Sequence, residues 1–370
     1  MNFNVQPSGV VGANSPIIYQ FFDALYTSTN FYYKVEVFVW TGTTTIPASP
    51  IAVIERVPDT FASGRAFVDI HKIVQQYLTN DFFTASGYKV NVNGGAVNCA
   101  VKVQGYYTTG MSSNVTALIT SNVVLATNGY TYMADGFNDP LVTTGLLTSK
   151  TKFIIPIGTP SYYVWFDASV VTELEIDVTA VTPNAVTGTA TRIQGVDLVQ
   201  LYTNAGVSGD ATLLVTAGAS QFAFAIERPC QNRYGLIPLH FLNRWGVYES
   251  YVFNALHRTQ IDVTRETFQR AMYAQTDMSA RWTYGYQINT PYLVNAKEKY
   301  TLNSNYIPED DNDSVQQMYL SDNILLQDGA IKSATITDSS LGFKTRTNDK
   351  LIDYTINVEV NSPLINKVVR

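Results

Sequence analysis

Regular alternation of apolar and polar residues is the main pattern along this chain. Within residues 32–40, Tyr33, Val35, Val37 and Val39 occupy every second position. A period of two is expected of a β-strand that turns one face to a core. Similar strands are predicted at residues 88–92, 101–106, 152–157, 162–166, 172–178, 236–242, 247–253, 334–337, 342–346 and 350–360. The pattern therefore predicts a mainly β protein.

Turn-forming residues between these segments predict how some of the strands pair. The Asn93-Gly94-Gly95 signal predicts a hairpin between residues 88–92 and 101–106. Residues 243–246, Asn-Arg-Trp-Gly, predict a tight hairpin between 236–242 and 247–253, and residues 347–349 predict a hairpin near the end. The stretch 178–191 is poor in large apolar residues, so we expect it to be a long polar connection.

Two segments change to a helical period. Residues 70–78 place apolar side chains at Ile70, Ile73, Val74, Tyr77 and Leu78, after Asp69 as the expected N-cap. The second segment begins with the acidic residues of 309–313, which favour the positive end of a helix dipole, and continues through 315–319. Few, short helices are therefore expected among the strands.

Length and composition indicate several cores and little surface charge. The chain has 370 residues, 46% hydrophobic and only 15% charged, with 24 Tyr and 18 Phe. Because single cores stop growing at about 250–300 residues, more than one domain is expected. We place the boundaries near residues 125 and 290, which gives a β-sandwich with one helix (1–125), a second β-sandwich (126–290) and a smaller α+β region with a final hairpin (291–370).

The net charge and the length of the apolar runs argue against nucleic acid and against a membrane as partners. The net charge is −6, the pI is about 5.1, and no basic stripe appears, so we expect no direct contact with nucleic acid. No apolar run approaches the ~18 residues of a membrane span, and the first residues lack a signal-peptide core. We expect no membrane contact and no export by the usual route, so Asn114 in Asn-Val-Thr is read as an accidental glycosylation motif.

Candidate catalytic and metal-binding residues are few. Cys99 and Cys230 are too isolated for a disulfide framework, and both are expected to be reduced and buried. The three histidines, His71, His240 and His257, have no metal-ligand spacing, so His71 is expected on a helix surface and His240 on a strand face.

Carboxylates give no stronger signal. Read as a calcium loop from Asp311, the acidic segment would need Gly and Glu where Gln316 and Asp322 stand, which favours the helix-capping interpretation. Glu173 and Glu175 are expected on one solvated strand face, although two-carboxylate glycosidase chemistry from separate elements stays open. We predict no catalytic, cofactor-binding or metal-binding residue, and no enzyme activity.

Aromatic residues crowd one short region. Most such side chains are core residues, but as a group on an outer face they would suit a protein interface, and carbohydrate binding would look the same in sequence. The crowded residues are Tyr19, Phe21, Phe22, Tyr26, Phe31, Tyr32 and Tyr33.

Several segments together carry a resemblance to a known class of protein. They are residues 14–21, 30–35, 67–74, 239–253, 342–346 and 348–351. In order and spacing they resemble virion structural proteins of tailed bacteriophages of Bacteroidetes and marine bacteria. The resemblance implies immunoglobulin- or fibronectin-like β-sandwiches that assemble into rings or sheaths, with no active-site residue to carry over.

We therefore expect a structural subunit of a phage tail or baseplate. It would form a homo-oligomer with cyclic symmetry, contact other virion proteins, and be located in the virion after assembly in the host cytoplasm. Low surface charge fits this role, because neighbouring subunits cover strand edges that would otherwise aggregate. The alternatives are a capsid decoration or fibre-anchoring protein, and a carbohydrate-binding module for host attachment with a host glycan as ligand. A glycan-degrading enzyme is the remaining, weakest alternative.

Overall fold

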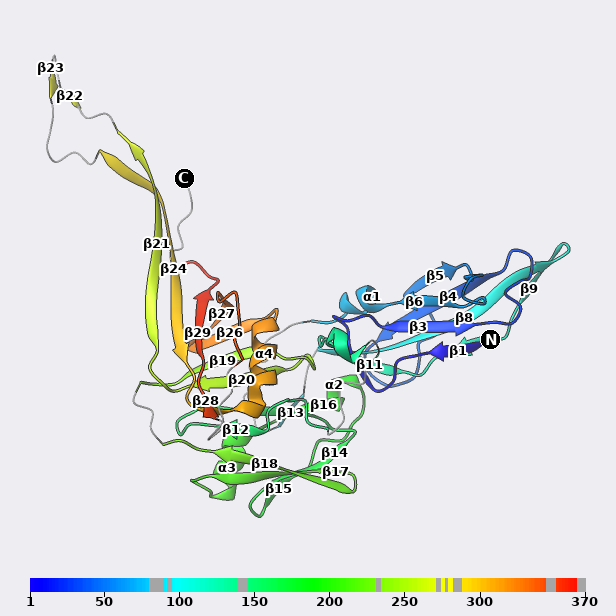
Figure 1. Cartoon of the computed structure of the whole chain (residues 1–370), viewed down its shortest axis with the longest axis horizontal. Helices are drawn as coiled ribbons and strands as arrows, with labels where there is room; N and C mark the ends of the chain where they lie inside the picture. The colour runs from blue at the N-terminus through cyan, green and yellow to red at the C-terminus, as the bar shows by residue number, and fades with distance from the viewer. Residues whose placement is uncertain are drawn as a thin grey trace.

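The chain folds as a mainly β protein with several sheets and few short helices (Figure 1). The computed structural model describes residues 1–79, 89–91, 95–136, 138, 145–230, 234–270, 274–276, 279–281, 288–343 and 351–364. Large apolar side chains collect in three main cores, drawn from residues 11–126, 146–226 and 237–360. The parts built around these cores are called the first, second and third units below.

The first unit places two sheets on either side of one core. One sheet has the strand order β1-β3-β6, and the other has the order β2-β11-β8-β4-β5, with β9 and β10 added to β8. Along β4 (Tyr32–Trp40), Tyr33, Val35 and Val37 are buried, as the alternation predicts. The remaining elements are β1 (Asn2–Val5), β2 (Val10–Gly12), β3 (Ile18–Phe22), β5 (Ala52–Arg56), β6 (Ala66–Asp69), α1 (His71–Gln75), β8 (Ala96–Thr109), β9 (Ser112–Val115), β10 (Ile119–Thr120), β11 (Val124–Thr127) and the 3-10 helix η1 (Met133–Asp135).

The first predicted helix is confirmed in place but is shorter than expected. It ends at Gln75, and Tyr77, expected on its apolar side, is 47% exposed. Ile70 and Val74 are buried. Ile70 rather than Asp69 occupies the N-cap position, yet the Asp69 carboxylate accepts a hydrogen bond from the His71 backbone N–H at 3.1 Å.

The second unit also has two sheets around one core, with orders β12-β18-β17-β14-β15 and β13-β16-β7. The expected polar connection at 178–191 is wrong in part, since it contains a short strand and a helical turn. The elements are β7 (Lys89–Asn91), β12 (Lys152–Ile154), β13 (Tyr163–Asp167), β14 (Val171–Ile176), β15 (Thr179–Val181), α2 (Thr189–Arg192), β16 (Ile193–Asp197), α3 (Leu198–Ala205), β17 (Ala211–Ala217) and β18 (Ser220–Glu227). Helix α3 was not expected, although Asp197 accepts a hydrogen bond from the Val199 N–H as its N-cap and Gly206 ends it at φ 69°.

The hairpin predicted between residues 88–92 and 101–106 is wrong. β7 pairs with β16 of the second unit, through Gln194 and Asn91 among others, whereas β8 pairs with β4. A turn signal describes only the local chain direction, while the partner of a strand depends on which sheet has a free edge beside it.

The third unit is built on a seven-stranded sheet, β20-β19-β26-β27-β29-β24-β21. The predicted hairpin of β19 and β20 is confirmed, with Leu242 opposite Tyr248. Residues 126–290, expected to form one sandwich, supply both the second core and part of the third, and residue 290 lies inside β24. The elements are β19 (Ile237–Leu242), β20 (Tyr248–Phe253), β21 (Arg258–Gln269), β22 (Ala274–Thr276), β23 (Ser279–Arg281), β24 (Asn289–Asn303), β25 (Ile307–Pro308), the 3-10 helix η2 (Glu309–Asp311), α4 (Asn312–Leu320), β26 (Ile324–Asp328), β27 (Ala330–Ile336), β28 (Leu351–Ile352) and β29 (Thr355–Val360).

The second predicted helix is confirmed as α4, and Val315 and Met318 join the third core. The turn predicted at Thr347, Asn348 and Asp349 lies outside the described residues. Within them, β29 pairs with β24 and β27. From this sheet β21 and β24 project as a long hairpin arm, visible in yellow in Figure 1. No helix in the described ranges combines the length and apolar character that crossing a membrane requires.

Candidate functional site

The three units meet at a buried junction, and the Asn-Arg-Trp-Gly turn of residues 243–246 lies in it. A small apolar cluster there includes Val10 of the first unit, Trp165 of the second and Trp245 of the third. Trp165 Nε1 also donates a hydrogen bond to the Tyr248 carbonyl at 2.8 Å. Residues far apart in the sequence are thus fixed against one another at this point.

Asn243 shapes the turn. Its Oδ1 accepts hydrogen bonds from the backbone N–H groups of Trp245 (3.0 Å) and Val247 (3.3 Å). Its Nδ2 donates to the Leu147 carbonyl at 2.8 Å and to Glu249 Oε2 at 3.0 Å. One buried amide therefore closes the turn and attaches it to the second unit.

The next residues of the turn contact the first unit. The Arg244 guanidinium forms an ion pair with Asp135 at 2.8 Å and lies over the Tyr132 ring, 4.8 Å from its centre. The Arg244 carbonyl accepts a hydrogen bond from the Tyr130 N–H at 2.8 Å. Gly246 has φ 75°, and a Cβ atom there would lie 2.6 Å from the backbone nitrogen of Gly129. Glycine is required at this position both by backbone conformation and by close packing.

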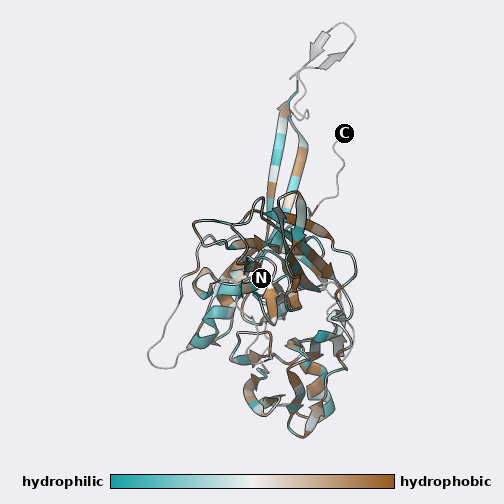
Figure 2. Cartoon of the chain, turned by 90° about the vertical axis from the view of Figure 1, so that its right-hand side faces the viewer, coloured by the Kyte–Doolittle hydropathy of each residue, from teal (hydrophilic) through white to brown (hydrophobic). Residues whose placement is uncertain are grey.

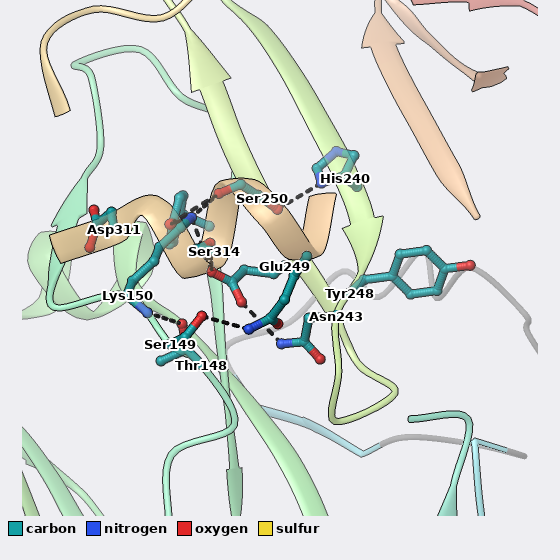
Figure 3. Close-up of polar contacts among 12 residues, drawn as sticks. Thr148, Ser149, Lys150, His240, Asn243, Tyr248, Glu249, Ser250, Asp311 and Ser314 are labelled. Carbon is teal, nitrogen blue, oxygen red and sulfur yellow. Dashed lines mark hydrogen bonds and ion pairs between the residues drawn. The ribbon is translucent and has the colours of Figure 1, made fainter. Parts of the chain in front are cut away.

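A buried polar network lies beside the turn (Figure 3). Lys150 and Glu249 are both buried and form an ion pair at 3.5 Å. Lys150 Nζ also donates hydrogen bonds to Tyr162 Oη at 2.9 Å and to the Ser250 carbonyl at 2.5 Å, and it lies 3.9 Å from the centre of the Tyr251 ring. The lysine of the second unit is thus surrounded by acceptors and aromatic faces, several of them from the third unit.

Glu249 and Asp311 complete the network. Glu249 Oε1 accepts a hydrogen bond from the Ser314 hydroxyl at 2.9 Å. Asp311 Oδ1 accepts from the Thr151 N–H at 2.9 Å and from the Thr151 hydroxyl at 3.0 Å. The acidic segment lies at the start of α4 as expected, and Asp311 occupies the N-cap position. Its side chain, however, accepts no hydrogen bond from a helix N–H and instead holds the second unit against α4.

The protonation states in the network follow from its burial. Burial by itself lowers the pKa of Lys150, but Tyr162 and Glu249 outweigh this effect and raise that pKa above its usual value. Burial raises the pKa of Tyr162 and the pKa of Asp311, the latter against the opposing hydrogen bonds of Thr151. Lys150 is consequently held as a cation at neutral pH and does not act as a free base there.

The junction has little room for a ligand. A cavity of about 20 Å³ lined by Lys150, Tyr162 and Asn254 has space for about one water molecule. Small-molecule sites typically enclose about 300–1,000 Å³. The arrangement can orient the three units relative to one another, whereas an organic substrate does not fit in it.

The histidines weighed from sequence are placed apart. His71 is half-buried at the start of α1, and its Nδ1 lies 2.9 Å from Asp69 Oδ2. His240 lies on β19, where its Nδ1 and the Ser250 hydroxyl are 2.7 Å apart and its Nε2 lies 3.1 Å from Gln327 Oε1. Within the described ranges no group of three or more His, Cys, Asp or Glu side chains is placed to hold a metal ion.

The carboxylate pair and the two cysteines considered from sequence lie in different parts of the fold. Glu173 and Glu175 are half-buried on β14 on either side of the buried Leu174, so they share a strand face as predicted. Cys99 is buried as expected, but Cys230 is exposed, so that prediction is wrong for Cys230. Cys230 lies three residues after the end of β18, outside the buried cores.

The crowded aromatic residues mostly fill the first core, so they do not form the outward group considered from sequence. Tyr19, Phe21 and Tyr33 are fully buried and Phe31 nearly so, while the remaining three, Phe22, Tyr26 and Tyr32, are half-buried.

The structure reveals junction residues that sequence reasoning did not single out. Lys150 stands in a polar Ser-Lys-Thr stretch, where no local pattern indicates burial. Asn243 was expected only as part of a turn.

Comparisons with known proteins add little. No protein-family model matches the chain, and a search of curated proteins finds no match. Among solved structures, the chain is similar to Drosophila OTK, extracellular domains 3–5, with 9% sequence identity and a TM-score of 0.21. That alignment covers 81% of this chain and 92% of the other. A likeness of this size supports no argument about fold or function.

Proposed function

We propose that the chain is a non-enzymatic structural subunit of a tailed-phage virion, placed in the tail or baseplate. In this proposal it forms a homo-oligomer with cyclic symmetry and contacts other virion proteins. The first and second units would be immunoglobulin- or fibronectin-like sandwiches, which is supported by the two sheets that share each core. The segment resemblance described above motivates the virion class.

The observation that carries an assembly role is the hairpin arm of β21 and β24. Eleven of the twelve residues of β21 are exposed and the twelfth, Asp262, is half-buried. A two-stranded hairpin without a core beneath it is marginally stable in water. An arm of this length is therefore expected to gain its order from a partner.

Both faces of the arm present side chains that a partner could contact. Val263 lies directly opposite Ala296, and Ile261, two residues earlier, lies on the same face. Ile261 is 53% exposed and Val263 40% exposed. On the other face Lys299 forms an ion pair with Asp262 at 2.6 Å. Figure 2 shows apolar and polar bands alternating along the arm. Glu298 lies directly opposite Ile261, and Arg265 follows Val263 on the same face, so this face carries exposed apolar side chains among charged ones. Exposed apolar side chains framed by charges suit a contact with a neighbouring subunit.

The buried junction supports the same role. The Lys150–Glu249 pair and the 243–246 turn attach all three units to one another through polar and apolar contacts. Buried polar networks contribute to a unique arrangement more than to total stability, a role we assign to this one as a hypothesis. A subunit that holds its arm in a fixed direction relative to its body is suited to a repeating assembly.

Immunogold electron microscopy on purified particles of the source phage tests the proposal. Antibody raised against the full chain is expected to label the tail or its tip. Label over the head would instead support the capsid decoration alternative. If disrupted particles contain no chain by immunoblot, the virion proposal is wrong. A spike of the recombinant chain into the same blot controls for detection.

A further inference from the structure

We propose that a groove on the first unit binds a carboxylated saccharide. The groove is open to solvent and lies beside β3, β6 and the loop from β5 to β6, with a volume of about 420 Å³. This volume falls within the range of about 300–1,000 Å³ typical of small-molecule sites. Its lining includes Gln20, Arg56, Val57, Asp59, Arg65 and Phe67. The site goes beyond the proposed assembly role and does not depend on it.

Two arginines stand at the ends of the loop that joins β5 to β6. Arg56 is the last residue of β5, and Arg65 directly precedes β6. Both side chains are exposed, and neither forms an ion pair within the described part of the chain. A guanidinium binds a carboxylate through two parallel hydrogen bonds, which makes a pair of free arginines a site for an acidic group. In a chain of net charge −6, this local positive charge is a distinct feature.

The loop between the arginines is held in one conformation. The Asp59 N–H donates to the Arg65 carbonyl at 3.0 Å, and the Gly64 N–H donates to the Asp59 carbonyl at 2.8 Å. The Tyr33 hydroxyl, from inside the core, donates to the Gly64 carbonyl at 2.7 Å. Gly64 has φ 76°, and the Tyr26 ring packs directly against it. A site that is ordered before binding loses less conformational entropy when a ligand arrives.

The remaining lining residues suit a sugar ring. Phe67 is 63% exposed and lies directly opposite Gln20 in the β3–β6 pair, so both side chains extend from the outer face of this sheet. An exposed aromatic face offers a stacking surface, and the Gln20 amide and Asp59 carboxylate offer hydrogen bonds to hydroxyl groups. A free inorganic anion would use the arginines but would have no need of Phe67. A protein surface would need an area much larger than this groove.

Isothermal titration calorimetry on the full chain, with trigalacturonate as the probe, tests the proposal. Galactotriose serves as the neutral counterpart, and inorganic phosphate as the simple anion. We expect saturable binding of trigalacturonate and none of galactotriose. Arg56→Gln and Arg65→Gln are each expected to weaken binding by ~10-fold or more, because each removes a charge-assisted hydrogen-bonding group. Phe67→Ala should weaken it while leaving the charge unchanged.

The matched control is Arg258→Gln, an exposed arginine on β21 outside the groove. It should bind trigalacturonate as the unchanged chain does, and circular dichroism should show that every variant is folded. The proposal is overturned by the absence of saturable trigalacturonate binding, by equal binding of galactotriose, or by phosphate binding that equals trigalacturonate binding and is unaffected by Phe67→Ala. Equal loss in Arg258→Gln would also overturn it, since binding would then follow total charge.

Discussion

Lys150 Nζ lies 3.5 Å from Glu249 Oε1, with both side chains buried where the second and third units meet. Two ions that leave water together depend on each other, because either one alone would be an uncompensated charge in the interior.

Glu249→Ala is therefore expected to lower the free energy of unfolding by about 3–5 kcal/mol. It leaves Lys150 without its ion-pair partner and removes the acceptor of Asn243 and Ser314. Urea denaturation followed by fluorescence measures the change. The double variant Lys150→Met/Glu249→Leu should recover much of the loss, because no unpaired charge remains. If the single and double variants lose the same stability, the ion pair is not the cause.

Replacing Gly246 tests the contact between the 243–246 turn and the first unit. Gly246→Ala should destabilise the protein by more than the ~1–2 kcal/mol that a left-handed backbone costs a non-glycine residue, because its Cβ would also meet the Gly129 backbone. Gly218 has φ 62° and open space around it, so Gly218→Ala carries the backbone cost alone. Differential scanning calorimetry should show the larger drop in melting temperature for Gly246→Ala. Equal drops would contradict the close packing.

Removal of the arm should abolish assembly while leaving the folding of the chain unchanged. Replacing residues 264–295 by a two-residue Asn-Gly turn deletes exposed strand but leaves the third core in place, since its residues belong to other segments. We expect a melting temperature close to that of the full chain and loss of any homo-oligomer in analytical ultracentrifugation. The control Phe67→Ala changes an exposed side chain of the first unit and keeps the arm, so it should retain the oligomer. An oligomer that survives the deletion would show that the arm is not the assembly element.

The two thiols should react at very different rates. Cys230 is exposed, whereas Cys99 is buried in the first core, where burial raises its pKa to about 12. Since the thiolate is the reactive form, Ellman's reagent should modify Cys230 quickly in the folded chain and Cys99 only after unfolding. Cys230→Ser removes the fast phase, and Cys99→Ser leaves it. Fast modification of both thiols in folded protein would contradict the burial of Cys99.

His240 should contribute to the loss of stability in mild acid. Burial lowers its pKa, partly opposed by the Gln327 hydrogen bond, and Lys150 lowers the pKa further. The unfolded chain therefore takes up a proton at His240 near pH 6.5, and the folded chain only at a lower pH. Between these values the unfolded state binds more protons, so the free energy of unfolding falls as the pH falls.

His240→Asn should reduce this fall, measured by urea denaturation between about pH 7 and about pH 5. His257→Asn is the control, because His257 is only half-buried and has no carboxylate contact within the described residues. A pH dependence that is identical in the two variants would exclude His240 as its source.

Local sequence patterns correctly predicted those elements whose structure is determined by residues close to them in the sequence. The alternation in 32–40 gives β4 because each inward position meets the same core. The hairpin of β19 and β20 was predicted because Gly246 can adopt the positive φ that its turn needs.

The arm and the junction could not be found in this way. β21 has no core on either face, so the polar residues of 258–269 follow no burial pattern. Lys150 is buried because residues about 100 and 160 positions later supply Glu249 and Asp311. A single polar stretch carries no information about such distant partners.

The pairing of β7 with β16 has a consequence for the time course of synthesis. Residues 89–91 leave the ribosome about 100 residues before their partners at 194–196, which at ~5–20 residues per second is a delay on the order of 5–20 s. During that interval β7 has unpaired backbone groups and β16 does not yet exist. An unpaired strand edge is a site for aggregation. Slower translation between these segments should therefore lower the yield of soluble chain.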